Sequence, residues 1–188
     1  MALKVLFAAS EAYPLIKTGG LADVAYGLPV ALHTERAEVR LLLPAYYDMM
    51  GKLKDVHSLG ALQIQGAGRV HTVHILEGSH EAFPFPIWVV ECGTLFGRSG
   101  NPYMHPDGYD WPDNAERFTV FARAAALLAA DALQLNWRPD VVHAHDWQTG
   151  LIPALLEEIN PRPRSIFTIH NLAYGGHFSR TVYDQLQL

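Results

Sequence analysis

The sequence predicts an α/β domain built on a doubly wound, mostly parallel sheet, and three observations carry that prediction. First, Lys4–Ala9 and Val39–Leu43 are short apolar runs without alternation, which is typical of strands buried on both faces. Second, Leu21–His33 lies between them with apolar residues at helical spacing, which completes a βαβ unit. Third, Val141–His145 and Ser165–His170 are apolar runs that lead into polar residues. Strands of open α/β sheets often end this way at the edge where ligands bind.

Composition and charge exclude several classes of function. The chain has 188 residues, of which 49% are hydrophobic and 18% charged, as in soluble globular proteins. Its net charge of −5 indicates no basic surface, so neither nucleic acid nor an anionic membrane is expected as a partner. Cys92 is the single cysteine, which suits a reducing compartment, and Ala124–Ala130 is too short to span a membrane. The first apolar run is too short for a signal peptide, so we expect a cytoplasmic protein.

The first half of the chain should combine a βαβ unit with a hairpin. The helical pattern over Leu21–His33 contains Pro29, which predicts a kink or a shorter helix. Tyr46–Gly60 has no clear period, and we expect a loop with at most one short helix there. Ala61–Gln65 and Val70–Leu76 alternate around a glycine-containing turn, which predicts a hairpin.

The second half should contain a strand, a long loop and two helices before the last strand. Pro86–Glu91 has the composition of a strand, and Gly93–Pro112 that of a loop. A loop of about twenty residues in a compact domain is unusual enough to suggest a function. A helix is expected at Thr149–Ile159, whereas the tail Tyr183–Leu188 stops in mid-pattern without a cap.

The strongest helix prediction covers Asp113–Leu133. Phe118, Phe121 and Leu128 fall on one face of it and should point into the core. Asp113 can accept a hydrogen bond from a first-turn N–H group, and Glu116 stands three residues later, as in a capping box.

A glycine-rich loop follows the first strand and is the first candidate site. Lys17, Gly19 and Gly20 immediately precede the predicted helix. The free N–H groups and the positive dipole end at a helix N-terminus attract anions, and Lys17 adds a positive charge suited to phosphate. Adjacent glycines allow positive φ angles and a close approach of ligand to backbone. The alternative is an ordinary βα turn with a surface lysine.

Polar residues at two other strand ends form a second candidate site. His143, His145 and Asp146 invite a metal interpretation, but the spacing supplies no further ligand set beyond His170. The alternative is that one histidine is a hydrogen-bonded packing residue. His170 and Asn171 follow the last strand and are suited to hydrogen-bond a hydroxylated ligand, or else to cap the loop.

Aromatic residues gather in the long loop. Tyr103, Tyr109 and Trp111 have rings that can stack on sugar rings. The alternative is that the same rings anchor the loop to the domain.

Four blocks of sequence together resemble the bacterial glycogen synthases and plant starch synthases. They extend, in the order of that family, from about residue 4 to about residue 178. The blocks are Lys17–Val24, Pro102–Tyr103 with Tyr109–Phe118, Val141–Trp147 and Phe167–Tyr174.

The resemblance implies a retaining glucosyltransferase that moves glucose from ADP-glucose to the non-reducing end of an α-1,4-glucan such as glycogen. It implies the GT-B fold, in which two Rossmann-like halves face each other across a cleft. Residues 1–188 would then be the N-terminal, acceptor-side half. No cofactor and no metal are expected, and ADP-glucose is the donor substrate.

The resemblance also carries site residues over to this chain. His170 would lie against the transferred glucose, where its carbonyl and ring support developing positive charge, and Asp146 would line the cleft beside it. Lys17 would meet the phosphates or the glucose of the donor. The remaining substrate-binding positions implied are Glu11, Gly19, Gly20, Asp23, Tyr103 and Asn171.

The chain departs from the family pattern in two places and in length. Gly175 stands where a glutamine is common, and Leu32–Val39 lacks the usual Gly-His pair. The nucleotide-binding C-terminal domain, with its cationic pair for the diphosphate, is absent, so we expect the chain alone to be inactive. Competing interpretations are a non-catalytic module that binds glucan or sugar nucleotide, and a metal-dependent hydrolase built on His143, His145 and Asp146.

Overall fold

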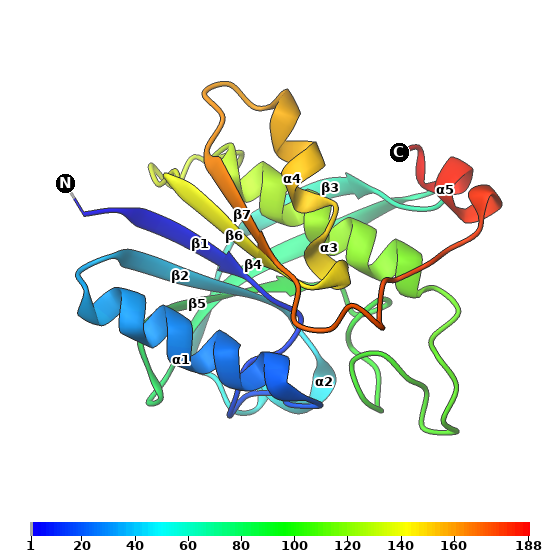
Figure 1. The fold of residues 1–188 in the computed structure, drawn as a ribbon, viewed down its shortest axis with the longest axis horizontal. Helices are drawn as coiled ribbons and strands as arrows, with labels where there is room; N and C mark the ends of the chain where they lie inside the picture. The colour runs from blue at the N-terminus through cyan, green and yellow to red at the C-terminus, as the bar shows by residue number, and fades with distance from the viewer. Residues whose placement is uncertain (1) are drawn as a thin grey trace.

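In the computed structural model, which describes residues 2–188, seven strands form one sheet in the order β3-β4-β5-β2-β1-β6-β7 (Figure 1). Strands β5, β2, β1, β6 and β7 run parallel, and β4 is antiparallel to both of its neighbours. The strands are β1 (Lys4–Ala8), β2 (Glu38–Pro44), β3 (Lys54–Gln65), β4 (Val70–His80), β5 (Phe83–Glu91), β6 (Val141–His145) and β7 (Arg164–Thr168). The prediction of a mostly parallel, doubly wound sheet with a hairpin is confirmed.

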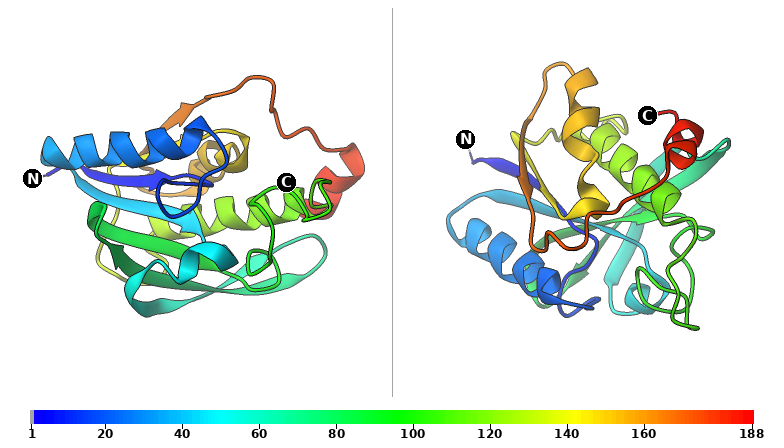
Figure 2. Two further views of the ribbon diagram at one scale, coloured as in Figure 1. Left: turned by 90° about the horizontal axis from the view of Figure 1, so that it is seen from below. Right: turned by 45° about the vertical axis from the view of Figure 1, so that its right-hand side comes forward.

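Helices cover both faces of the parallel part of the sheet. The helices are α1 (Gly20–Thr34), α2 (Tyr47–Met50), α3 (Asn114–Ala129), α4 (Ile152–Leu155) and α5 (Arg180–Leu186), with 3₁₀ turns η1 (Trp147–Thr149) and η2 (Leu156–Glu158). Helix α1 packs on β2 and β5, whereas α3 lies on the other side with α4 (Figure 2). Connections from β1 and from β5 lead in opposite directions along the sheet, so right-handed crossovers place their helices on opposite faces.

The core lies between these layers, around the central strands β1 and β2. Leu6, Phe7 and the β2 residues Leu41–Leu43 are fully buried, which explains why both strands read as continuous apolar runs. Helix α1 continues through Pro29 to Thr34, so the predicted shortening is wrong. The buried Pro29 faces the sheet, and packing on β2 and β5 holds the helix across the position where proline removes an N–H donor.

The hairpin is longer than predicted. The short helix expected in Tyr46–Gly60 is present as α2, but Lys54–Gly60 belongs to β3 instead of a loop. Its first residues are exposed and pair with the far end of β4, with Lys54 opposite Ser79 and His57 opposite Glu77. Backbone pairing forms this part of the ribbon without burying side chains, so no hydrophobic alternation marks it in the sequence.

The helical segments after the long loop are shorter than predicted. Helix α3 ends at Ala129 instead of Leu133, and the predicted helix Thr149–Ile159 is divided into η1, α4 and η2. Strand β7 ends at Thr168, two residues before the predicted end. The tail does contain a helix, α5, whose first turn is capped because Ser179 Oγ accepts a hydrogen bond from the Val182 N–H group.

The predicted capping of α3 by its acidic residues is wrong. The Asp113 side chain makes no cap hydrogen bond and instead accepts two from the Arg98 guanidinium, at 2.9 and 2.5 Å. Arg117, which is fully buried, donates to the carbonyl oxygens of Leu95 and Pro102 at 2.7 and 2.8 Å. Arg98 on the long loop and Arg117 on α3 therefore fasten the loop to the start of this helix.

Glu116 fastens the hairpin turn to α3. Its carboxylate accepts hydrogen bonds from the Ala67 N–H group at 3.0 Å, from Arg69 Nη2 at 3.1 Å and from His71 Nε2 at 2.8 Å. A Cβ at Gly66 would lie 2.5 Å from Glu116 Oε1, so the turn needs glycine there. Burial acts to raise the pKa of Glu116, but these hydrogen bonds outweigh burial and leave that pKa below its ordinary value.

We expect Glu116→Gln to destabilise the fold by about 1–3 kcal/mol at pH 7, because two charge-assisted hydrogen bonds weaken. A lowered folded-state pKa means that the stabilisation is present above the unfolded value of about 4.3 and is lost as pH falls through the folded value. The difference between wild type and variant should therefore shrink from pH 7 to pH 3 in urea unfolding. Glu81→Gln, at an exposed position, is the control. An equal difference at both pH values contradicts the prediction.

Candidate active site

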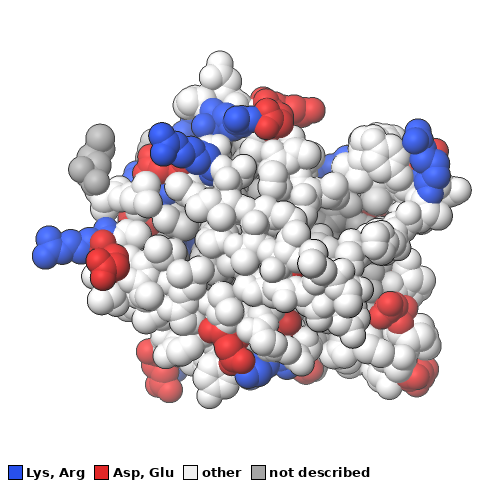
Figure 3. Space-filling model, viewed as in Figure 1, with Lys and Arg blue, Asp and Glu red and all other residues white. Residues whose placement is uncertain are grey.

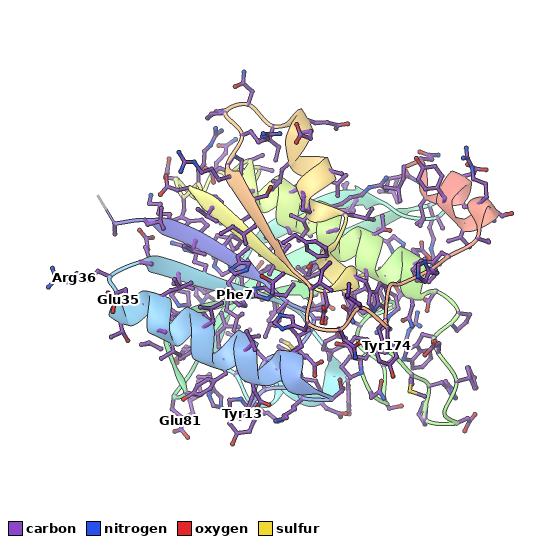
Figure 4. All side chains as sticks on the ribbon, in the orientation of Figure 1. Phe7, Tyr13, Glu35, Arg36, Glu81 and Tyr174 are labelled. Carbon is purple, nitrogen blue, oxygen red and sulfur yellow. The ribbon has the colours of Figure 1, made fainter. Side chains whose placement is uncertain are left out.

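Three strand ends meet at one edge of the sheet, as predicted. Strand β6 lies between β1 and β7, so the residues that follow these three parallel strands are neighbours. Phe7 lies in the strand layer near the end of β1 (Figure 4), and its ring stacks on that of His145 with centroids 4.2 Å apart. On the face of the molecule seen in Figure 1, charged side chains lie mainly around the rim, and the middle is mostly uncharged (Figure 3).

Glu11 organises the glycine-rich loop. Its buried carboxylate accepts hydrogen bonds from the N–H groups of Thr18 and Gly19, the latter at 3.3 Å, and from Thr18 Oγ1 at 3.0 Å. Both backbone donors lie just before α1, which begins at Gly20, so they precede the first-turn N–H groups that were predicted to attract an anion. The N–H groups of Thr18 and Gly19 are held by the protein's own Glu11.

Tyr103 connects the long loop to the same carboxylate. Its hydroxyl lies 2.7 Å from Ser10 Oγ and 3.1 Å from Glu11 Oε1. Burial raises the pKa of Tyr103 well above its ordinary value, so the hydroxyl stays protonated. It donates a hydrogen bond to Glu11. Trp111, by contrast, packs on the guanidinium groups of Arg98 and Arg117, which supports the anchoring alternative for that ring.

Lys17 and Asp23 form an ion pair at 2.6 Å, with side chains 45% and 56% exposed. Gly19 is the N-cap of α1 and Gly20 is its first residue. Neither glycine has a positive φ angle, so the expectation that the pair serves backbone conformation is wrong. A Cβ at either position would have no atom within 4 Å, so the space next to both residues is open to a ligand.

The two histidines of β6 pair with the last residue of β7 and with a histidine that follows that strand. His145 Nδ1 lies 2.9 Å from His170 Nε2, and His143 Nε2 lies 2.8 Å from Thr168 Oγ1. Burial, reinforced by His143 and His170, lowers the pKa of His145 to about 3, and burial also lowers the pKa of His143. Both buried rings are therefore neutral at pH 7.

Asp146 holds the backbone of His170 in place. Asp146 adopts φ 58° and ψ 177°, a conformation that is rare outside glycine. Its N–H group donates to the Thr168 carbonyl at 2.9 Å, and its Oδ1 accepts from the His170 N–H group at 2.7 Å. The ring of His170 itself is exposed at the edge of the sheet.

Asn171 faces a different feature, a largely apolar hollow of about 470 Å³ between α3, β7 and the C-terminal segment. Its Oδ1 accepts a hydrogen bond from the Ala173 N–H group at 2.9 Å. Tyr174, on the segment that follows β7, also lines the hollow (Figure 4). A Cβ at Gly175 would lie 2.6 Å from His177 Nε2, so a larger residue there would require this exposed imidazole to move.

The structure thus brings the predicted site residues together in three groups. Glu11 joins Gly19 and Tyr103, Lys17 joins Asp23, and Asp146 joins His170. Within residues 2–188 no three or more His, Cys, Asp and Glu side chains are arranged to hold a metal ion. The sequence did not single out Thr18 as a site residue, and only its place in the glycine-rich block could have indicated it.

A mostly parallel sheet with a glycine-rich βα loop, carboxylates and a histidine at its carboxyl edge defines a Rossmann-like domain. Open α/β sheets of this kind generally bind their ligands at that edge. The chain belongs to the starch synthase catalytic domain family, whose model matches residues 4–188. The resemblance found in the four sequence blocks is confirmed.

Curated relatives are glycogen synthases. That of Hydrogenovibrio crunogenus is 48% identical over 186 residues, 99% of this chain and 38% of the relative. Glycogen synthase 2 of Nitrosococcus oceani is 49% identical over 98% of this chain and 37% of the relative. The chain therefore spans little more than a third of the length of these relatives.

A solved structure has the same fold. The catalytic domain of starch synthase IV from Arabidopsis thaliana, bound to ADP and acarbose, matches 93% of this chain and 35% of that one. The TM-score is 0.76 and the identity 30%, which confirms the predicted GT-B relationship of the fold. In the part of the chain that the structure describes, no helix has the length and apolar character needed to cross a membrane.

Two variants should show how differently the charged side chains of Glu11 and Lys17 contribute to stability. Glu11→Gln leaves backbone donors weakly paired in a buried place, so we expect a loss of about 1–3 kcal/mol of stability. Lys17→Gln removes one partner of an exposed pair and should change stability by less than about 0.5 kcal/mol. Urea unfolding of both variants is the measurement. Equal losses would show that the carboxylate does not hold the loop.

Proposed function

We propose that this chain is the N-terminal, acceptor-side half of a glycogen synthase. The complete enzyme would transfer glucose from ADP-glucose to the non-reducing end of an α-1,4-glucan with retention of configuration. One observation carries the proposal: a chain of this family gathers Glu11 with the glycine-rich loop, and Asp146 with His170, at one sheet edge. The relatives that it matches over 98–99% of its length are named glycogen synthases.

The glycine-rich loop is proposed to receive the phosphates of the donor. Gly19 and Gly20 leave open space, and Lys17 can turn from Asp23 toward a diphosphate because the exposed pair is weak. The N–H groups of Thr18 and Gly19 would then bind phosphate oxygen in competition with Glu11. The presence of ADP in the matched starch synthase structure supports a nucleotide ligand here.

His170 is proposed to lie against the transferred glucose. Retaining transfer passes through a state with positive charge on the sugar ring, and a fixed carbonyl and imidazole stabilise such charge. Asp146 fixes the His170 backbone through the hydrogen bond at 2.7 Å, and its carboxylate adds negative charge at the same place. Tyr103 holds the loop that borders the site, and Asn171 would contact the glucan. Acarbose is itself an oligosaccharide analogue, and its presence in the matched structure supports a glucan subsite.

The remaining partner is proposed to be a C-terminal domain with cationic side chains for the diphosphate. Neither a cofactor nor a metal is required in this proposal, and the enzyme would work in the cytoplasm. Dialysis of the complete enzyme against a chelator should leave its activity unchanged. Zinc bound in stoichiometric amount and lost together with activity would favour the metal-dependent hydrolase instead.

A second candidate is a non-catalytic module that binds glucan or sugar nucleotide. The observation in its favour is that the chain spans only 37–38% of these relatives. Saturable glucan binding without turnover, even when the chain is joined to the remaining part of a relative, would favour the module.

His170→Ala should lower kcat of the complete enzyme by on the order of a hundredfold or more, with little change in KM. A group that acts mainly in the transition state has this effect. The assay is incorporation of labelled glucose from ADP-glucose into glycogen. His177→Ala, an exposed histidine beyond the site, is the control. An unchanged kcat would remove His170 from the mechanism.

The 188-residue chain alone should fold but show no detectable transfer. In the proposed site, Lys17 and the loop N–H groups are the groups that neutralise a diphosphate, and an open site leaves each contact exposed to water. We therefore expect donor affinity of about millimolar or weaker. The complete enzyme is the positive control in the same glucose-incorporation assay. Turnover by the chain within about a hundredfold of that control would refute a two-domain site.

A further inference from the structure

His145 is completely buried, yet one of its ring nitrogens reaches the edge of the sheet. Its ring packs against those of Phe7 and His143, with centroid distances of 4.2 and 4.1 Å. Nδ1 lies 2.9 Å from Nε2 of the exposed His170. The two rings are close to parallel, with an interplanar angle of 19°. His145 therefore connects the apolar core with the exposed histidine at the strand end.

The surroundings of His145 decide which of its nitrogens carries the proton. Nε2 is buried and has no hydrogen-bond partner in residues 2–188. A proton on Nε2 would bury an N–H group without an acceptor, which costs more than burying an unpaired lone pair. Burial also lowers the pKa of His145 to about 3, so the ring carries one proton. We assign that proton to Nδ1, where it is donated to His170.

This assignment also fixes the proton of the neutral His170 ring. Because His170 Nε2 accepts the hydrogen bond from His145, the proton of His170 lies on Nδ1. The backbone of His170 is held separately, by Asp146 Oδ1 on its N–H group at 2.7 Å. One contact thus holds the backbone, and the other holds the ring and its tautomer.

We propose that His145 is a positioning residue that holds His170 as the Nδ1–H tautomer in one ring orientation. His145 does not touch the substrate and acts through His170. The effect on catalysis rests on the proposed function, whereas the tautomer does not. The competing explanation is that His145 only fills the core.

The tautomer can be measured directly on the wild-type chain. Nitrogen-15 NMR of the histidine-labelled protein distinguishes protonated from unprotonated ring nitrogens, and comparison with His170→Gln identifies the His170 signals. We expect an unprotonated Nε2 and a protonated Nδ1 on His170 at neutral pH. A proton on Nε2 of His170 in the wild type would overturn the proposal without any variant having to fold.

Variants at position 145 test the cause. His145→Phe keeps a ring packed against Phe7 and His143 but removes the donor, so the His170 signals should change to a mixture of tautomers. The amide nitrogen of Asn occupies about the place of Nδ1, so His145→Asn should restore the wild-type pattern. The matched control is His143→Asn, since His143 bonds Thr168 and not His170. A merely structural role would give the same change in the control, or no change in either variant.

Kinetic measurements on the complete enzyme test whether this positioning affects catalysis. His145→Phe should lower kcat by about tenfold to a hundredfold with donor KM nearly unchanged, because a group that acts in the transition state loses its orientation. His145→Asn should recover most of that loss. If the wild type transfers no glucose, the proposed function fails while the NMR result still decides the tautomer. If His145→Phe changes neither tautomer nor kcat, the positioning role fails and the proposed function stands.

Discussion

The arrangement of the sheet edge depends on the carboxylate of Glu11. It lies just after β1 and accepts hydrogen bonds from the loop residues Thr18 and Gly19 and from Tyr103 of the long loop. One buried side chain therefore joins the glycine-rich loop to the long loop, whose Tyr103 lies 92 residues further along the chain. The N–H groups of Thr18 and Gly19, just before α1, are thus satisfied by the protein itself. Under the proposed function, a phosphate that binds here would exchange with this internal carboxylate, so binding would be a competition between two anions.

Most of the fold could be predicted because the buried strands carry their own signal. Continuous apolar runs and helical spacing identified the central strands and α1 without any tertiary information. The predictions that were wrong concern segments whose structure is decided by contacts with distant parts of the chain. The first residues of β3 are exposed and are strand only because β4 lies beside them. Aspartate is a common N-cap residue, but the Asp113 carboxylate binds Arg98 of the long loop instead of the first-turn N–H groups.

The site was predictable in its position and less so in its contacts. Parallel strands bring Glu11, Asp146 and His170 to one edge, and that follows from topology. The pairing of His145 with His170 depends on the register of β6 against β7, which places His145 opposite Thr168. No spacing in the sequence reveals that register. The pairing of Lys17 with Asp23 is equally invisible in the sequence, since residues six apart need not meet.

The backbone of Asp146 has a consequence for how firmly the His170 arrangement is held. Its conformation at φ 58° costs about 1–3 kcal/mol, and contacts with Thr168 and His170 offset that cost. Both partners belong to or follow β7, which is one of the two edge strands of the sheet formed by residues 2–188. Opening of that one strand would release the strain and separate His170 from its supports, while the central sheet stays intact. Amide hydrogen exchange at His170 should therefore report local opening well below the free energy of global unfolding.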